Sequence, residues 1–432
     1  AQADPLDELV DARLVEVQLG SGQQTRYRLH DLTRIFALEL LAVEIPQSER
    51  LAAQQRLLSC WLFLVSHAHR REYGGDFTVL HSQAPHWPLP DDLLDDLLDD
   101  PIEWLHSERD NLVAAVGLAA RLGLTELCWD LAVTSTTLFE ARSHRQAWRH
   151  THELALEAVR QAGDTRGEAV LRYSRGGLAL MEKRLDEARE DLEAALAWFD
   201  AAGDQHGYGL AAGDLALIAR LQGQPAQARQ RCEVAVAALQ AAGDLVGEAY
   251  VLRTYAQVQH DLGRLAEAES LLHEAAAICA RASSRRVEAQ IRHALGELFL
   301  EQERLVDAER EFTAVLEIVQ GTDDPGGKAY ALLGLGSVAL ARGDLDRAGT
   351  ELAAALVEAR RAGNRLGQGR ILLATAHWAA ASGDTSAADT ALAQAVGLFQ
   401  EVGAPSWLER ARQLRAQLAA RPQPATVGGT GD

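Results

Sequence analysis

The sequence predicts an all-α protein in which pairs of helices stack along the chain as an α-solenoid. Residues 164–403 repeat six times at a fixed interval of 40, and no gap breaks the phase. One position of the unit is always small: Gly176, Ala216, Ala256, Gly296, Gly336 and Ala376. Twelve places later the unit always has alanine: Ala188, Ala228, Ala268, Ala308, Ala348 and Ala388. A repeat of this length is typical of a solenoid, because each unit can bury its apolar face only against its neighbours.

Two breaks in each unit predict that it consists of two helices. At unit boundaries, Gly163, Gly203, Gly243 and Gly363 can take the left-handed conformation that ends a helix. The Asp or Asn that follows each of these glycines can cap the next helix. Midway through the unit a second short turn recurs, as at Gly263.

Three glycines stand inside the predicted helices, at the small position of their units: Gly176, Gly296 and Gly336. A glycine in a helix interior costs about 1 kcal/mol relative to alanine. We therefore expect close packing of a neighbouring helix at these positions.

The spacing of these residues resembles the tetratricopeptide repeat, which has a small residue at its eighth position, Ala at its twentieth, a bulky residue at its twenty-fourth and Ala at its twenty-seventh. The bulky site is filled here by Leu192, Cys232, Leu272, Phe312, Leu352 and Leu392. The family unit has about 34 residues, so the extra residues of this unit predict longer helices. Most of the family's Trp and Tyr positions are absent. The resemblance implies a right-handed solenoid of helix pairs.

Weaker signals extend the array at both ends. Residues 124–163 are predicted to form a degenerate helix pair, because Ala155 stands 40 places before Ala195. A capping helix is predicted over residues 404–420. Residues 421–432 are rich in Pro, Gly and Thr, so we expect them to be disordered.

Residues 1–45 predict two strands between two helices. The elements follow one another as a helix running into a strand (6–17, with the strand at 13–17), a glycine turn (20–22), a strand (25–29) and a helix (32–44). This order is expected of the last part of a winged-helix domain. Residues 46–123 are predicted to form a helical adapter between this domain and the repeats.

The end of the second strand carries a more specific motif, Arg-Tyr-Arg-Leu-His-Asp-Leu over residues 26–32. It resembles the segment that ends the winged-helix domain of NB-ARC-type STAND regulators, and most closely the actinobacterial transcriptional regulators of the SARP type. In that family the histidine senses the β-phosphate of bound ADP. The resemblance implies this role for His30, with Asp31 supporting the local fold. The alternative is that His30 caps the helix that follows.

A second motif supports the same resemblance. Residues 103–116 include Trp-Leu-His-Ser-Glu-Arg-Asp-Asn-Leu, which is similar to a segment that these regulators carry between winged helix and repeats. Its apolar residues fall on one helical face and are expected to pack the adapter onto the first repeats: Trp104, Leu105, Leu112, Ala115 and Val116.

No sequence signal supports catalysis, and the chain is expected not to be an enzyme. The stretch Gly326–Ala329 lacks the glycine spacing and the hydroxyl of a phosphate loop. The segment is therefore expected to carry no cofactor, whereas the resemblance implies ADP or ATP with Mg²⁺ in a longer protein. The chain begins at Ala1 in mid-pattern, so we expect it to be a fragment of such a protein.

Composition favours partners other than nucleic acid or membrane. Lys and Arg total 42 against 62 Asp and Glu, a net charge of −20, and no basic stripe is visible. No apolar run reaches the roughly 20 residues of a membrane span. Four scattered cysteines without a C-x-x-C pair indicate a reducing, cytoplasmic setting: Cys60, Cys128, Cys232 and Cys279.

Two polar clusters have simpler explanations than metal binding. His67, His69, His81 and His86 lie near Asp76, but no tight pair of ligands anchors them as zinc would require. Residues 91–100 alternate pairs of Asp and Leu and predict a short amphipathic helix. They lack the glycine and spaced oxygens of a calcium loop.

The first helix of each repeat is expected to line a concave groove. In this register the groove contains aromatic and polar side chains, which are common in binding hot spots: Tyr173, Tyr250, Arg253, Gln257, His260, Gln290, His293, Glu297 and Tyr330. The leading interpretation is a sensor and interaction arm of a STAND-type regulator, which binds a protein, a peptide or a small effector and thereby controls a nucleotide-locked core. The alternative is a stand-alone scaffold that assembles protein partners.

Overall fold

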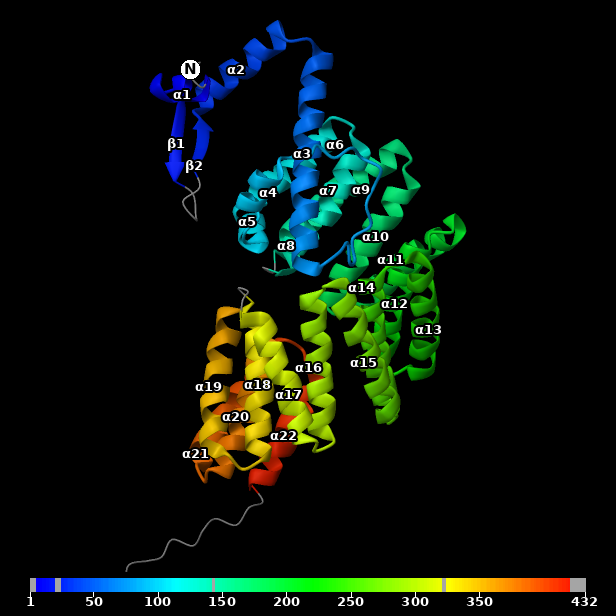
Figure 1. Cartoon of the computed structure of the whole chain (residues 1–432), viewed down its shortest axis with the longest axis vertical. Helices are drawn as coiled ribbons and strands as arrows, with labels where there is room; N and C mark the ends of the chain where they lie inside the picture. The colour runs from blue at the N-terminus through cyan, green and yellow to red at the C-terminus, as the bar shows by residue number, and fades with distance from the viewer. Residues whose placement is uncertain (1–4, 20–24, 142–143, 321–323, 420–432) are drawn as a thin grey trace, which may run out of the picture. The chain divides into compact units, whose positions relative to one another are not determined.

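The computed structural model describes residues 5–19, 25–141, 144–320 and 324–419. The chain divides into two compact units, Ala1–Ile218 and Ala219–Asp432, and each is described by itself (Figure 1). The predicted fold class is confirmed: helices dominate both units, and the only described sheet is a hairpin near the N-terminus.

The first unit opens with a short helix and an antiparallel hairpin. These elements are α1 (Pro5–Asp11), β1 (Val15–Leu19) and β2 (Thr25–Leu29). In the register of the hairpin Val15 lies opposite Leu29 and Val17 opposite Tyr27. β1 begins two residues later than predicted, because Arg13 has a positive φ of 56° that a strand cannot accommodate. The predicted turn at residues 20–22 lies outside the described residues.

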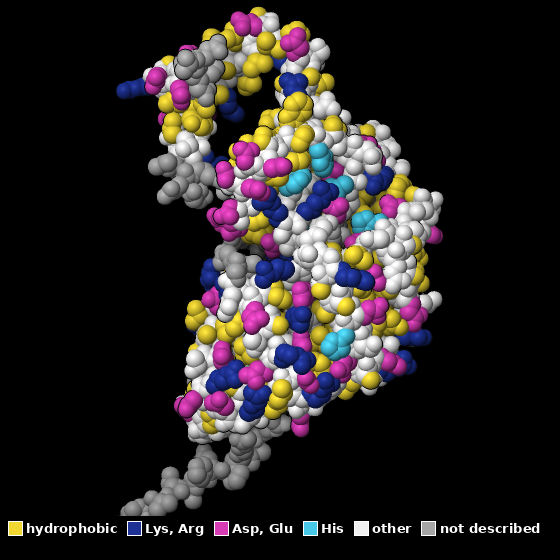
Figure 2. Space-filling view, in the orientation of Figure 1, with side chains coloured by type: hydrophobic (Ala, Val, Ile, Leu, Met, Phe, Trp, Pro, Cys, Tyr) yellow, Lys and Arg dark blue, Asp and Glu magenta, His cyan; other side chains and the backbone are white. Residues whose placement is uncertain are grey.

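Helix α2 (Asp31–Glu44) follows the hairpin and has no buried residue. Its apolar side chains are open to solvent: Leu32 is 82% exposed and Phe36 63%. Figure 2 shows apolar side chains gathered along this helix.

The adapter region consists of a long helix and three shorter ones. These are α3 (Gln47–Tyr73), α4 (Asp91–Leu97), α5 (Pro101–Ser107) and α6 (Arg109–Arg121). The amphipathic helix predicted from residues 91–100 is present as α4, with Leu94 buried against the protein.

The prediction of one helical face over residues 103–116 is wrong in one respect. The segment forms two helices, because the chain breaks its helix at Glu108. The carboxylate of Glu108 accepts a hydrogen bond from Asn111 Nδ2 at 2.6 Å and forms an ion pair with Arg26 of the hairpin. Glu108 is only 8% exposed, so these partners hold it between α5 and α6. The apolar residues of both helices are nevertheless buried, as expected: Trp104, Leu105, Leu112, Ala115 and Val116. The two motifs thus meet through Arg26 and Glu108.

The helix pairs follow the 40-residue period closely. The first unit continues with α7 (Thr125–Thr134), α8 (Thr136–Ala141), α9 (Arg145–Ala162), α10 (Thr165–Met181), α11 (Leu185–Ala202) and α12 (Gln205–Leu221), in which the boundary between units falls. The second unit contains α13 (Pro225–Ala242), α14 (Leu245–Asp261), α15 (Leu265–Ala282), α16 (Arg285–Glu301), α17 (Leu305–Gln320), α18 (Pro325–Ala341), α19 (Leu345–Arg361), α20 (Arg365–Ala381), α21 (Thr385–Glu401) and α22 (Pro405–Ala419).

The predicted turn chemistry is present at the unit boundaries. Gly163 has a φ of 70°, and the following Asp164 accepts a hydrogen bond from the Gly167 N–H at 2.9 Å. Asp244 caps α14 in the same way, and Asn364 caps α20. Each cap satisfies an N–H that the first turn of a helix otherwise leaves without a partner.

The in-helix glycines are explained by close helix packing. A Cβ at Gly176 would lie 2.7 Å from Leu192 Cγ, and a Cβ at Gly296 2.6 Å from Phe312 Cε1. A Cβ at Gly336 would lie 2.9 Å from Leu352 Cγ. In all three repeats the small residue of the first helix therefore faces the bulky residue of the second.

Candidate functional site

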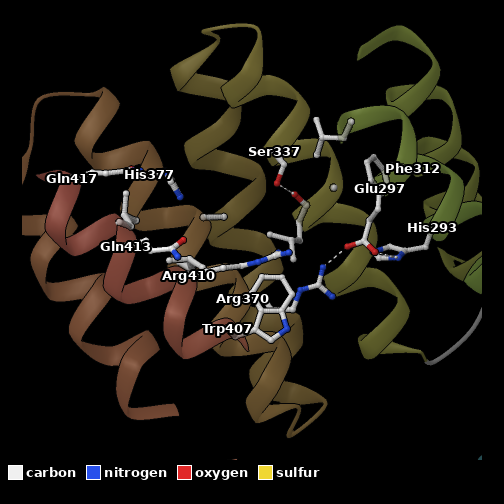
Figure 3. Close-up of a pocket in the computed structure, with 16 residues that line it drawn as sticks. His293, Glu297, Phe312, Ser337, Arg370, His377, Trp407, Arg410, Gln413 and Gln417 are labelled. Carbon is white, nitrogen blue, oxygen red and sulfur yellow. Dashed lines mark hydrogen bonds and ion pairs between the residues drawn. The ribbon is translucent and has the colours of Figure 1, made fainter. Parts of the chain in front are cut away.

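The second unit contains a pocket of about 390 Å³ that follows the repeat register (Figure 3). Its wall is formed mainly by α16, α18, α20 and α22, with Phe312 added from α17. Two rows of side chains spaced by 40 residues line it: His293, Leu333, Leu373 and Gln413 in one row, and Glu297, Ser337, His377 and Gln417 in the other. The pocket thus lies on the first helices, where a groove was predicted.

The centre of the pocket is a charged pair with aromatic neighbours. Arg370 of α20 forms an ion pair with Glu297 of α16. The Nδ1 atom of His293 lies 3.7 Å from Glu297 Oε2. The Arg370 guanidinium lies over the Tyr330 ring, 5.3 Å from its centre, and His293 meets the same ring edge-on. Aromatic rings and a carboxylate therefore fix the position of Arg370.

The surroundings of this centre lower the pKa of both His293 and Glu297. Burial lowers the pKa of His293 despite the opposing effect of Glu297, and Arg370 lowers it further. Burial alone would raise the pKa of Glu297, but His293 and Arg370 lower it below its ordinary range. At neutral pH the pocket therefore holds a neutral imidazole beside an ionised carboxylate.

A second guanidinium enters the pocket from the last helix. Arg410 of α22 lies over the Trp407 ring at 4.7 Å from its centre, and Arg370 lies at 4.7 Å from the same ring. Figure 3 shows both arginines turned toward the centre of the pocket, with Trp407 beside Arg370.

Apolar side chains form the rest of the lining: Leu300, Phe312, Leu333, Leu373, Ala374 and Leu414. They lie next to the polar centre. A ligand that combines an apolar body with polar or charged groups fits such a surface.

The structure brings together three of the groove residues predicted from the sequence. His293, Glu297 and Tyr330 meet around Arg370. Gln290 is exposed on α16 one turn before His293.

The other groove residues of the second unit contact one another on α14 or side chains of neighbouring helices. The Arg253 guanidinium stacks over the ring of Tyr250, 5.0 Å from its centre. Gln257 Oε1 accepts a hydrogen bond from Arg220 Nη1 at 3.1 Å, and His260 bonds Glu301. These contacts lie along α14 and are not part of the pocket lining.

Tyr173 was predicted to line the groove, but it is buried. Its side chain is only 5% exposed, within the helix packing around α10 of the first unit. An aromatic ring at this position serves the interior rather than an open surface, so the repeat register alone misassigned it.

Sequence reasoning missed Arg370, Trp407 and Arg410. The two arginines had a usable signal, because they continue the row Tyr250, Gln290 and Tyr330 at the same interval of 40. Trp407 had none, since its importance depends on the placement of α22 against α20.

His30 lies at the N-cap position of α2, but its side chain makes no capping hydrogen bond. Its Nε2 atom instead lies 3.2 Å from Glu16 Oε1 of β1, and the side chain is 53% exposed. His30 therefore occupies the cap position of α2 without capping it through its imidazole. Asp31 is the first residue of α2 and is exposed.

The stretch Gly326–Ala329 forms the first turn of α18. The Gly327 N–H donates to Asp324 Oδ1 at 2.8 Å, as at the other helix starts. This geometry is a helix cap.

The histidine-rich stretch of the first unit forms a polar cluster around Asp130. His81 Nδ1 lies 2.8 Å from Asp130 Oδ1, and His81 Nε2 lies 3.4 Å from Asp76 Oδ1. Ser82 donates both its N–H and its hydroxyl to Asp130 Oδ2. In the part of the chain that the structure describes, no group of three or more His, Cys, Asp or Glu side chains is arranged to hold a metal ion.

All four cysteines are free thiols. Burial raises the pKa of Cys128 and that of Cys232 to about 12, and it does the same for Cys279. Cys232 occupies the bulky position of its repeat and is fully buried. These three thiols therefore have packing roles.

The paired helices and their spacing define a tetratricopeptide-repeat region. The family model described as a tetratricopeptide repeat matches residues 247–321. The chain is also similar to the regulatory protein AfsR of Streptomyces griseus, with 28% identity over 194 residues. This match covers 45% of the chain but only 19% of the regulator, so the chain corresponds to a small part of that relative.

Solved structures share the fold. One is the STAND protein PH0952 of Pyrococcus horikoshii, which has a tetratricopeptide-repeat sensor; it has 12% identity and a TM-score of 0.59, over 96% of this chain and 56% of that one. Another is NprR in complex with its cognate peptide NprX, with 13% identity and a TM-score of 0.50, over 66% of this chain and 82% of that one. At these identities the likeness concerns the fold.

Among the described residues, no helix combines the length and the apolar character needed to cross a lipid bilayer.

Proposed function

We propose that this chain is the sensor and interaction arm of a STAND-type transcriptional regulator of the SARP type. The pocket of the second unit binds a protein, a peptide or a small effector. The observation that carries the proposal is the lining of this pocket by matching positions of four first helices, α16, α18, α20 and α22. A ligand in it contacts several helix pairs at once and so favours one packing of those pairs over another.

Three similarities support the proposal. The similarity to AfsR supports a regulatory role, and the fold shared with PH0952 supports the position of sensor. The fold shared with the NprR complex favours a peptide among the ligands.

The arm is not itself an enzyme in this proposal, and it needs no cofactor. Ser337 contributes its hydroxyl to the pocket, but this group donates to the Leu333 carbonyl at 2.8 Å, as expected of a hydroxyl in a helix. The unpaired thiols fit a cytoplasmic location, and the acidic composition disfavours direct binding of nucleic acid.

Blocking the pocket tests the function. His377 lines the pocket and is exposed, so His377→Trp should fill the space without disturbing the interior. Peptides selected from a phage-displayed random library on the wild-type chain should bind this variant at least about tenfold more weakly, a loss of about 1.4 kcal/mol. Isothermal titration with synthetic copies of the selected peptides measures the difference.

The matched control is His273→Trp. This histidine is 52% exposed on α15 and does not line the pocket, so its replacement should leave the affinity unchanged. Selected peptides that bind both variants as well as the wild type would contradict the proposed function.

We propose in addition that His30, supported by Asp31, acts through bound nucleotide in a longer protein that supplies the phosphate loop and the Mg²⁺ site. The support is the Arg26–Leu32 motif and the exposure of the His30 imidazole beside the hairpin. In such a protein His30→Ala should remove a charge-assisted contact of about 1.5–3 kcal/mol with ADP. Retention of ADP through gel filtration is the readout, and the exposed His150→Ala is the control. Equal retention by His30→Ala and the wild type would rule out the nucleotide role.

A further inference from the structure

The pocket of the second unit has a charge opposite to that of the chain as a whole. The protein carries a net charge of −20. Among the Arg, Lys, Asp and Glu side chains that line the pocket, Arg370 and Arg410 oppose the single carboxylate of Glu297. The two guanidiniums exceed the carboxylate by one positive charge.

This excess charge belongs to Arg410. Arg370 already forms an ion pair with Glu297. The Arg410 guanidinium is held over Trp407, and it forms no hydrogen bond or ion pair with another residue that the structure describes. Stacking on a ring face leaves the N–H groups at the edge of a guanidinium available, and two of them match the two oxygens of a carboxylate.

An apolar surface adjoins this cation. Leu414 follows Arg410 by one turn of α22, and Leu333 and Leu373 continue the surface on α18 and α20. These leucines line the pocket although each is at least nine-tenths buried. A ligand can therefore place a charged group at Arg410 and an apolar group on the leucines.

We infer that the pocket binds an organic monoanion with an apolar body, whose carboxylate is held by Arg410. This inference rests on the proposed function and names the chemistry of the ligand. One excess positive charge favours a monoanion. A doubly charged group such as a phosphate ester would keep one negative charge without a partner, and Glu297 would repel that charge. The source of the carboxylate is either a free organic acid or the end of a peptide chain.

The inference also gives α22 a role beyond closing the stack. This helix begins 40 residues after α20, and Arg410 occupies the same repeat position as Arg370. Gln413 and Gln417 likewise continue the rows of His293 and Glu297 into the pocket lining. α22 is thus a further first helix of the array, and it supplies the cation that recognises the ligand.

The test uses three probes on the 432-residue chain: octanoate, the N-acetylated tripeptide Ala-Ala-Leu with a free carboxylate, and the same tripeptide as an amide. Isothermal titration should show that the tripeptide acid or octanoate binds at least tenfold more tightly than the amide. If only octanoate binds tightly, the ligand is a free organic acid. If the tripeptide acid binds tightly, the ligand is the carboxyl end of a peptide. Arg410→Gln should remove the preference for the acid, whereas it should persist in Arg412→Gln. Arg412 lies on the same helix, is 62% exposed and does not line the pocket.

Three results would overturn the inference: equal affinity for acid and amide, equal effects of the two arginine variants, or no binding of any probe. If the affinity of the selected peptides falls in His377→Trp but is unchanged by amidation of the peptide and by Arg410→Gln, the inference is overturned and the proposed function stays intact. Melting temperatures of both arginine variants should match the wild type, because both side chains are exposed.

Discussion

Replacing Phe312 with Ala should lower the free energy of unfolding by about 3–5 kcal/mol, the usual cost of removing a large buried ring. Phe312 fills the bulky position of its repeat and is fully buried. Its ring lies against two glycines, Gly296 on α16 and Gly334 on α18. The ring therefore joins two successive helix pairs, and its loss leaves a cavity that the small residues around it cannot fill.

The glycines provide the matched half of this test. A Cβ at Gly334 would lie 2.3 Å from Phe312 Cδ1, so Gly334→Ala should cost about 1–3 kcal/mol through overpacking. The cost should shrink in a Phe312→Leu background, because the smaller side chain vacates the site. Gly397→Ala is the control: it stands in α21 with no atom within 4 Å of an added Cβ, and it should stabilise by about 0.5–1 kcal/mol. Urea denaturation measures the free energy of unfolding of each of these variants. Equal effects of Gly334→Ala and Gly397→Ala would contradict the packing explanation.

Raising the pH from 6.5 to 9 should destabilise the first unit by roughly 2–3 kcal/mol through His81. Burial alone would lower the pKa of His81, but its hydrogen bonds to Asp130 and Asp76 raise it to about 9. A raised pKa in the folded state means that the contribution is complete below the ordinary value of 6.5 and is lost as the pH rises toward 9.

The buried groups His69, His152 and Asp130 of the first unit act outside this window. Burial lowers the pKa of His69 to about 4 and that of His152 to about 3, so their contributions are lost only as the pH falls below 6.5. Burial alone would raise the pKa of Asp130, but His81 and Ser82 lower it, so its contribution is lost at still lower pH. Stability should therefore be greatest near pH 6.5.

The variant His81→Gln isolates this effect. It should show little change in stability between pH 6.5 and 9, whereas the exposed-site control His150→Gln should behave as the wild type. Urea unfolding followed by circular dichroism at several pH values gives the comparison. A wild-type stability that is the same at pH 6.5 and 9 would show that the His81–Asp130 pair does not persist in solution.

The repeat architecture could be predicted from the sequence because its determinants are local or periodic. A glycine followed by Asp164 ends one helix and caps the next, and these groups lie within a few residues of each other. The close packing at Gly296, which leaves no room for a Cβ, could also be anticipated. The bulky residue that faces it recurs at a fixed distance along the chain.

The features that could not be predicted depend on contacts between distant segments. Glu108 breaks a helix that its own sequence would continue, and one of its partners, Arg26, comes from the hairpin. The buried pair of His81 and Asp130 joins a loop to α7 across 48 intervening residues, so it has no local signature. The charged centre around Arg370 likewise requires four helices to be in place.

The central claim is that the first helices of the second unit form the ligand-binding surface. Hydrogen exchange of the chain with and without a peptide selected on the wild type tests it most directly. The account predicts that added protection concentrates in α16, α18, α20 and α22, and that it disappears in His377→Trp. Protection confined to the second helices α17, α19 and α21, or to the first unit, would contradict it.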